Sequence, residues 1–189
     1  MELNSQVNFE LLEQQLRECF GRVVYSHKTQ EKCADIILRL HKRLKLFQII
    51  ISAVVTTSLL VKLFGDQDWA LMVGVLMSTL LFGINSYTKD YDLGEISQKH
   101  TNAANDLWDI RETYLSTITD LKAGQLTIDQ IIEKRDELQK RLLNVYSGSP
   151  RTTSKAYKEA SNSLKNQEEL TFSDKEIDAF LPKGLRKEG

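Results

Sequence analysis

The sequence is poor in residues that interrupt helices or cross-link small domains. It contains two prolines and nine glycines among 189 residues, and so few helix-breaking residues favour long helices. Two cysteines, Cys19 and Cys33, are too few for a disulfide-built scaffold. We predict that both are buried thiols, because each lies near an apolar stripe and their spacing is not that of metal ligands.

The chain also lacks a surplus of charge of either sign. Its 25 lysines and arginines are balanced by 26 aspartates and glutamates, which gives a net charge of −1. Neutralising the phosphates of a nucleic acid needs clustered, surplus cations. We therefore expect no direct nucleic-acid binding.

Motifs of catalysis and of cofactor binding are missing as well. The sequence has no G-x-x-x-x-G-K-[ST] loop, no G-x-G-x-x-G fingerprint and no G-x-S-x-G elbow. His27, His41 and His100 lack the H-E-x-x-H spacing of a zinc site. We therefore predict a protein that is not an enzyme and that has no catalytic residues, cofactor or metal ion.

Two long apolar runs are the most informative feature that is present. Residues 46–64 carry one charge, Lys62, and residues 69–88 carry none. As helices, the runs span about 28 and 30 Å, which matches the hydrocarbon core of a bilayer. Only four residues separate them, so we predict a transmembrane helical hairpin over residues 46–88. The alternative is a soluble bundle in which this hairpin is buried.

Charges beside the two runs predict how the hairpin is oriented. Four basic residues precede the first run: Arg39, Lys42, Arg43 and Lys45. The short connection carries Asp66 and Asp68 instead. Because cytoplasmic flanks are enriched in lysine and arginine, we predict that both termini are cytoplasmic and the connection is external.

Outside the hairpin, apolar spacing and breakers predict only helices. Residues 1–45 form N-terminal cytoplasmic helices that run into the first span, 89–149 form bundle helices, and 150–189 form polar C-terminal helices and a tail. Gly124 is a predicted helix stop, and Thr127 and Ser173 are predicted helix N-caps. The predicted fold class is all-α, a two-helix transmembrane hairpin continuous with a cytoplasmic helical bundle.

Trp108, Arg111 and Tyr114 lie on one of these bundle helices. They could stack on a base. We favour a core position for Tyr114, with the other two at its edge.

Polar and small residues inside the spans allow two interpretations. Gln48, Ser52 and Thr56 recur every four residues on one helix face, and Asn85 adds an amide near the cytoplasmic end. These groups either bond across helices or line a water-filled path. Small residues at spacings of four allow close helix packing; they are Gly74 with Ser78, and Thr79 with Gly83. Because two helices cannot enclose a pore, the second interpretation requires a homo-oligomer.

This arrangement resembles the SLATT family, the two-transmembrane effector domains of bacterial conflict systems. The resemblance rests on the hairpin, on the following helix with ANDLWDIRETYLSTI (104–118), and on NVYSGSPRTTSKAYKEA (144–160). It implies a pore-forming or membrane-disrupting effector of the bacterial inner membrane that acts in anti-phage defence. It also implies partners: a sensor protein encoded nearby, such as a cyclic-oligonucleotide synthase or a reverse transcriptase, or its nucleotide signal. The alternative is a membrane-anchored scaffold that recruits a cytoplasmic partner.

Overall fold

The computed structural model describes residues 2–65 and 67–187, and every regular element in these ranges is helical. The elements are α1 (Glu2–Gly65), α2 (Asp68–Asp90), α3 (Leu93–Lys122), α4 (Ile128–Gly148), α5 (Ser154–Asn166), α6 (Asp174–Phe180) and a 3-10 turn, η1 (Lys183–Leu185). The predicted all-α class is confirmed. Asp66 lies outside the described residues, as do Met1 and residues 188–189 of the predicted terminal segments.

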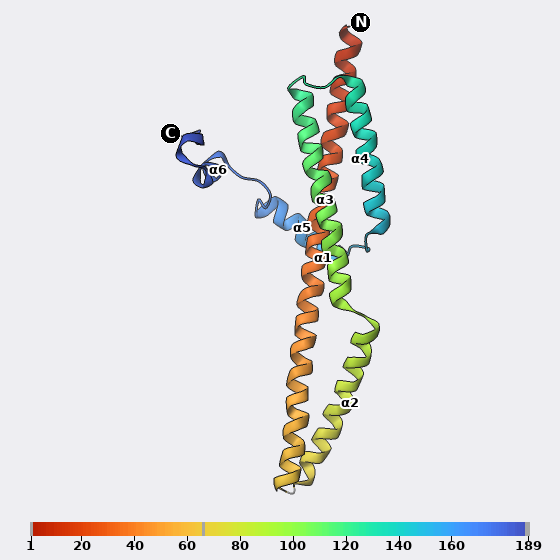
Figure 1. The fold of residues 1–189 in the computed structure, drawn as a ribbon, viewed down its shortest axis with the longest axis vertical. Helices are drawn as coiled ribbons and strands as arrows, with labels where there is room; N and C mark the ends of the chain where they lie inside the picture. Colours follow the sequence, from red (N-terminus) through yellow and green to blue (C-terminus); the bar gives the residue numbers. More distant parts are fainter. Residues whose placement is uncertain (1, 66, 188–189) are drawn as a thin grey trace.

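Helix α1 is the longest element of the molecule. Its 64 residues contain no proline, and at 1.5 Å per residue it is about 96 Å long. Figure 1 shows it running from the N-terminus to the turn of the hairpin. The predicted continuity between the cytoplasmic helix and the first span is confirmed, because one rigid element belongs to both.

Helices α2 and α3 pack in succession along most of α1, whose N-terminal turns extend beyond α3 (Figure 1). They are separated only by Tyr91 and Asp92. The Asp92 carboxylate accepts hydrogen bonds from the backbone N–H groups of Gly94 and Glu95, at 2.9 and 3.0 Å, and so caps α3. A helix of the bundle therefore begins immediately after the second span.

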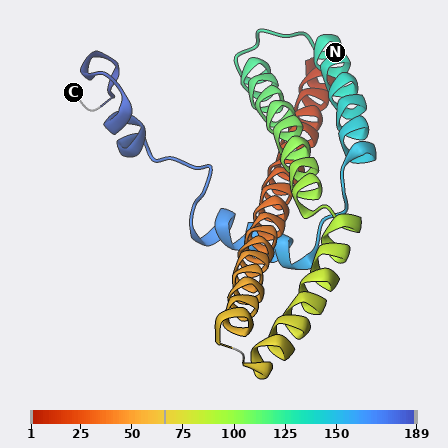
Figure 2. The same ribbon diagram turned by 60° about the horizontal axis from the view of Figure 1, so that its bottom comes forward.

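Helix α4 runs antiparallel to α3. Together with the first third of α1, the two helices form a three-helix bundle (Figures 1 and 2). The core of this bundle joins nine buried residues: Leu16, Cys19, Val23, Leu107, Ile110, Tyr114, Leu121, Ile131 and Leu138. Both cysteines are buried free thiols, as predicted. Tyr114 is fully buried, and burial, followed by the neighbouring Cys19 thiol, raises its pKa to about 12.

Local sequence signals explain where these helices begin and end. Gly124 has φ +66°, and the N–H groups of Gly124 and Gln125 donate to the carbonyls of Leu121 and Asp120. This Schellman arrangement ends α3. Thr127 and Gln130 then form a reciprocal capping box at the start of α4, and Ser173 forms the same motif with Glu176 in α6. The predicted stop and both predicted N-caps are confirmed.

The chain then crosses α1 near the middle of its length. Residues 149–170, here called the crossing segment, include α5, which packs on α1 (Figure 2). Helix α6 follows at a distance from the bundle (Figures 1 and 2). The crossing segment thus lies against the same helix that forms the first span.

Candidate functional site: the hairpin and the polar belt of the bundle

The two helices of the hairpin meet along one regular face of each. On α1 the buried or half-buried positions of the hairpin are 44, 48, 51, 55, 58, 61 and 62, and on α2 they are 70, 73, 74, 77, 81, 84 and 88. Apart from positions 61 and 73, both sets alternate spacings of four and three, which is the pattern of a left-handed helix pair. We call these two sets of positions the hairpin interface.

The outward surface of the hairpin is apolar. In the most apolar 18-residue stretch of each helix, only 11% of the residues are buried within the protein. The most exposed apolar side chains there include Phe47, Ile49, Leu63, Phe64, Met72, Leu76 and Phe82. A continuous surface of this kind is far larger than monomeric soluble proteins expose. A buried hairpin in a soluble bundle is therefore excluded, and the hairpin belongs in a membrane.

Polar groups join the two helices at the end of the interface that lies nearer the bundle. The Gln48 amide donates to Oδ1 of Asn85 at 2.9 Å and to the hydroxyl of Thr88 at 3.3 Å. In hydrocarbon such bonds are worth about 1 kcal/mol each. Gln48 and Asn85 thus bond across the hairpin in this arrangement.

Ser52 and Thr56 do not take part in that network. The Ser52 hydroxyl donates to the carbonyl of Gln48 at 2.8 Å, and the Thr56 hydroxyl donates to the carbonyl of Ser52 at 3.0 Å. Both side chains are exposed. Residues four apart on a helix differ by about 40° in direction. The row formed by Gln48, Ser52 and Thr56 therefore starts in the interface at Gln48 and has left it by Thr56.

Of the four small residues, Gly74 lies closest to α1. It is buried, and a Cβ built on it would lie 3.3 Å from Cβ of Ser58. Ser78, Thr79 and Gly83 are exposed, and a Cβ on Gly83 would meet no atom within 4 Å. Close packing inside the hairpin therefore centres on Gly74. Close packing at Ser78, Thr79 and Gly83 stays a prediction, and it would involve contacts with helices outside this hairpin.

Charged residues mark the two ends of the hairpin. At the turn, the Lys62 ammonium lies 2.8 Å from the Asp68 carboxylate. At the other end, Lys42, Arg43 and Lys45 are exposed, and Arg39 lies 3.5 Å from Glu159 of α5. One of the predicted topology residues therefore also ties α1 to the crossing segment.

Beyond the membrane, α1 contains four consecutive buried polar residues, His27, Lys28, Thr29 and Gln30. We call them the polar belt. They are covered on one side by α3 and on the other by the crossing segment. Buried polar groups are costly unless they are paired. Lys28 and Gln30 find partners on other elements, whereas Nδ1 of His27 is buried without a hydrogen-bond partner.

Gln30 shows how the polar belt connects those elements. Its Oε1 accepts a hydrogen bond from Nδ1 of His100 on α3 at 2.5 Å, which fixes the tautomer of that ring. Its Nε2 donates to the carbonyl of Pro150 at 3.4 Å. Burial lowers the pKa of His100 and of His27, so both rings are held neutral.

Lys28 makes the second connection to the crossing segment. Its ammonium is bonded to Glu169 and lies 2.9 Å from Glu31. Burial by itself lowers the pKa of Lys28, but the bonds to the two carboxylates outweigh it and the net pKa is raised. The bond to Lys28 likewise lowers the pKa of Glu169. Both groups are charged at neutral pH, so the contact is an ion pair.

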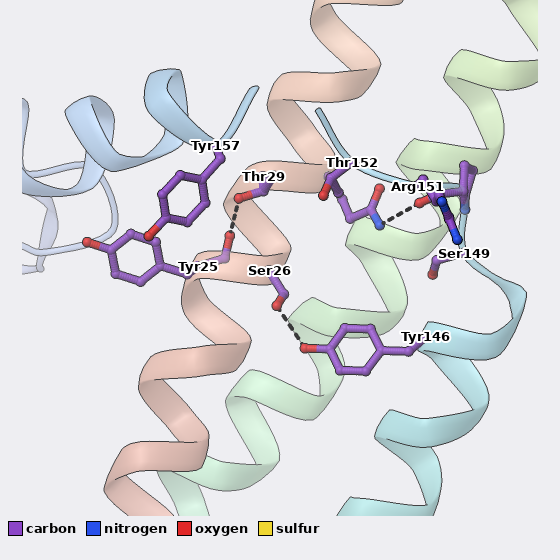
Figure 3. Close-up of a pocket in the computed structure, with 10 residues that line it drawn as sticks. Tyr25, Ser26, Thr29, Tyr146, Ser149, Arg151, Thr152 and Tyr157 are labelled. Atoms are coloured by element: carbon purple, nitrogen blue, oxygen red, sulfur yellow. Dashed lines mark hydrogen bonds between the residues drawn. The ribbon is translucent and has the colours of Figure 1, made fainter. Parts of the chain in front are cut away.

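A cavity of about 420 Å³ opens between the polar belt and the crossing segment (Figure 3). From α1 it is lined by Tyr25, Ser26, Thr29 and Gln30, and from the end of α4 and the crossing segment by Tyr146, Ser149, Pro150, Arg151, Thr152 and Tyr157. Two contacts brace it: the hydroxyls of Ser26 and Tyr146 lie 2.7 Å apart, and the rings of Tyr25 and Tyr157 stack with centroids 5.9 Å apart. Sequence reasoning singled out residues 144–160 but did not predict this cavity, because the other wall lies about 120 residues earlier.

The structure does not assemble the other ligand site that the sequence allows. Tyr114 is fully buried in the bundle core, whereas Trp108 is 50% exposed. The two rings therefore cannot hold a base between them, and the favoured core position of Tyr114 is confirmed. No cluster of three or more candidate metal ligands occurs within residues 2–65 and 67–187.

Comparison with known proteins identifies the family. Residues 12–176 match the SMODS and SLOG-associating 2TM effector domain family 4. The chain belongs to this SLATT family. The match includes both spans, the three-helix bundle and α5, so the SLATT domain is a two-span membrane effector that accounts for nearly the whole chain. Searches of curated proteins and of solved structures gave no significant match.

Proposed function

We propose that this SLATT protein is a non-enzymatic effector of bacterial anti-phage defence whose hairpins assemble into a pore in the inner membrane. Its N- and C-terminal parts lie in the cytoplasm, where a neighbouring sensor protein or its nucleotide signal activates it. The observation that carries the proposal is the row formed by Gln48, Ser52 and Thr56, which turns from the hairpin interface onto the outer surface.

The hydroxyls of this row suit two environments. Ser52 and Thr56 each donate to a carbonyl one turn earlier, so neither leaves an unsatisfied donor in lipid. Each oxygen can still accept a hydrogen bond from water. The row is therefore tolerated against lipid in a single hairpin and is able to face water where several hairpins meet.

The continuity of α1 supports a way of gating this pore. The same helix carries the polar belt at residues 27–30 and the polar row at residues 48–56. A change in how the cytoplasmic bundle packs therefore moves the first span directly, without a flexible joint. An activator needs only to favour one packing of the bundle over another.

The test removes polar groups from the row without changing its volume much. Bacteria expressing the Gln48→Leu, Thr56→Val double variant should retain membrane insertion but lose most of the depolarisation that the wild type causes, as read with a potential-sensitive dye. Thr57→Val is the matched control, because Thr57 is also exposed on α1 but about 100° away from Thr56. Undiminished depolarisation by the double variant would contradict the assignment of the row to a pore.

A hairpin exchange separates this proposal from a membrane-anchored scaffold. Residues 46–88 are replaced by an unrelated two-span hairpin, and the cytoplasmic bundle is kept. A pore-forming effector loses activity in this chimera, whereas a scaffold keeps it. The exchange is interpreted only where alkaline carbonate washing leaves the chimera in the membrane fraction.

A further inference from the structure

The cavity beside the polar belt has the shape of a ligand site. Its volume of about 420 Å³ lies within the range of about 300 to 1,000 Å³ that small-molecule sites occupy. One wall comes from α1, and the other comes from the end of α4 and the crossing segment (Figure 3). A ligand held there touches the membrane-spanning helix and the crossing segment at once.

The charge of the lining selects an anion. Arg151 is the one charged residue among those that line the cavity, and no acidic side chain joins it. It is exposed, and its planar guanidinium can bind a phosphate through two parallel hydrogen bonds. The first turn of α5, which follows directly, contains no acidic residue, so the positive end of this helix adds to the same field.

The remaining lining selects a planar ring. Tyr25, Tyr146 and Tyr157 all line the cavity, and Tyr146 and Tyr157 are 44% and 54% exposed. Aromatic side chains with free surface stack on bases of any sequence, each for about 1 to 3 kcal/mol. Ser149 and Thr152 also line the cavity (Figure 3), and the Ser149 hydroxyl, which donates to the carbonyl of Val145, can still accept a hydrogen bond from a sugar hydroxyl.

We propose that this cavity binds a nucleoside monophosphate or a ligand that contains one. The phosphate lies on Arg151, and the base lies against the exposed tyrosine rings. This inference rests on the proposed function in one respect, because a nucleotide signal is one of the activators named there. Binding itself needs neither pore formation nor a membrane, so a binding measurement tests the site separately from the pore.

The experiment measures the binding of radiolabelled AMP to the full-length protein in detergent by equilibrium dialysis. We expect saturable binding with Kd below about 1 mM. Arg151→Ala should weaken it at least about tenfold. Lys158→Ala is the matched control, because Lys158 is an exposed cation of α5 that does not line the cavity, and it should bind AMP like the wild type.

Unlabelled competitors test which parts of the ligand are recognised, and two substitutions of Tyr157 test the contact with the base. AMP should compete better than ribose 5-phosphate, which lacks the base, and better than adenosine, which lacks the phosphate. Tyr157→Phe should keep the affinity, whereas Tyr157→Leu should reduce it severalfold. An absence of saturable AMP binding, or equal losses in Arg151→Ala and Lys158→Ala, would overturn the site. Equal competition by ribose 5-phosphate and AMP would overturn its assignment to a nucleotide.

Discussion

Gly74 occupies the closest approach between the two membrane helices. Since a Cβ there would lie 3.3 Å from Cβ of Ser58, a branched side chain must push the helices apart. We expect Gly74→Val to destabilise the hairpin by about 1 to 3 kcal/mol and to lower its melting temperature in detergent. Gly83→Val is the control, because a Cβ on Gly83 meets no atom within 4 Å. Equal melting of the two variants would show that the helices do not meet at Gly74.

Two buried histidines make the three-helix bundle sensitive to acid. Burial lowers the pKa of His27 and of His100 in the folded state. Below about pH 6.5 the unfolded chain therefore binds protons that the folded chain does not, and stability is lost as the pH falls. The loss is at most about 1.4 kcal/mol per histidine and pH unit.

Thermal unfolding between pH 7.5 and 5.0 measures this loss. The His27→Gln, His100→Asn double variant should lose less stability over that range than the wild type. The amide introduced at position 100 keeps a donor for Oε1 of Gln30, which the His100 ring supplies in the wild type. The same acid sensitivity in both proteins would assign it to other groups.

At the scale of elements, both apolar and polar contacts hold the crossing segment to α1. Ala156 and Ala160 of α5 are fully buried, and the Tyr157 ring stacks on Tyr25. Glu169 bonds Lys28, and its other carboxylate oxygen lies 3.4 Å from Lys32. Pro150 and Glu159 add contacts to Gln30 and Arg39. The polar contacts are exchanged for water when the segment is released, so each adds only modestly to the free energy that holds it.

Neutralising Glu169 tests how this segment is held. Since Lys28 keeps Glu31 at 2.9 Å, we expect Glu169→Gln to cost about 1 kcal/mol, which is about fivefold faster hydrogen exchange in α5. Glu168→Gln is the control, because Glu168 is the exposed neighbour. Faster exchange in both variants, or in neither, would contradict the role of the Lys28 ion pair.

At the scale of the whole molecule, the charges at the two ends of the hairpin predict its orientation. Arg39, Lys42, Arg43 and Lys45 gather at the bundle end, whereas the turn carries Asp68 beside Lys62. Holding the basic end in the cytoplasm places the bundle and the C-terminal segment there as well.

Cysteine labelling checks this orientation in intact cells. A membrane-impermeant maleimide should label Gln67→Cys at the turn but not Gln139→Cys on α4 until the cells are opened. Both positions are exposed, and the native Cys19 and Cys33 are buried. Labelling of position 139 in intact cells would reverse the predicted topology.

Local physics made most of the fold readable from the sequence. Run length without charge predicted the spans, and Gly124, Thr127 and Ser173 predicted helix ends because each motif acts over four or five residues. The family resemblance used the same features and is confirmed by the match over residues 12–176.

The sequence did not predict which face of each span packs against the other span. A helix that is apolar all round has no stripe to mark its partner, so only packing places Gly74 in the interface and leaves Ser52 and Thr56 outside it.

The cavity shows the same division more sharply. Arg151 and Tyr157 reach it only because α4 returns antiparallel to α3 and brings them back to Tyr25, about 130 residues earlier in the chain. No local propensity encodes a contact of that separation. The helices, their caps and the two spans follow from the order of the residues alone, because short-range forces specify them. The polar belt and the cavity arise only in the folded chain, because they depend on which distant side chains packing brings together.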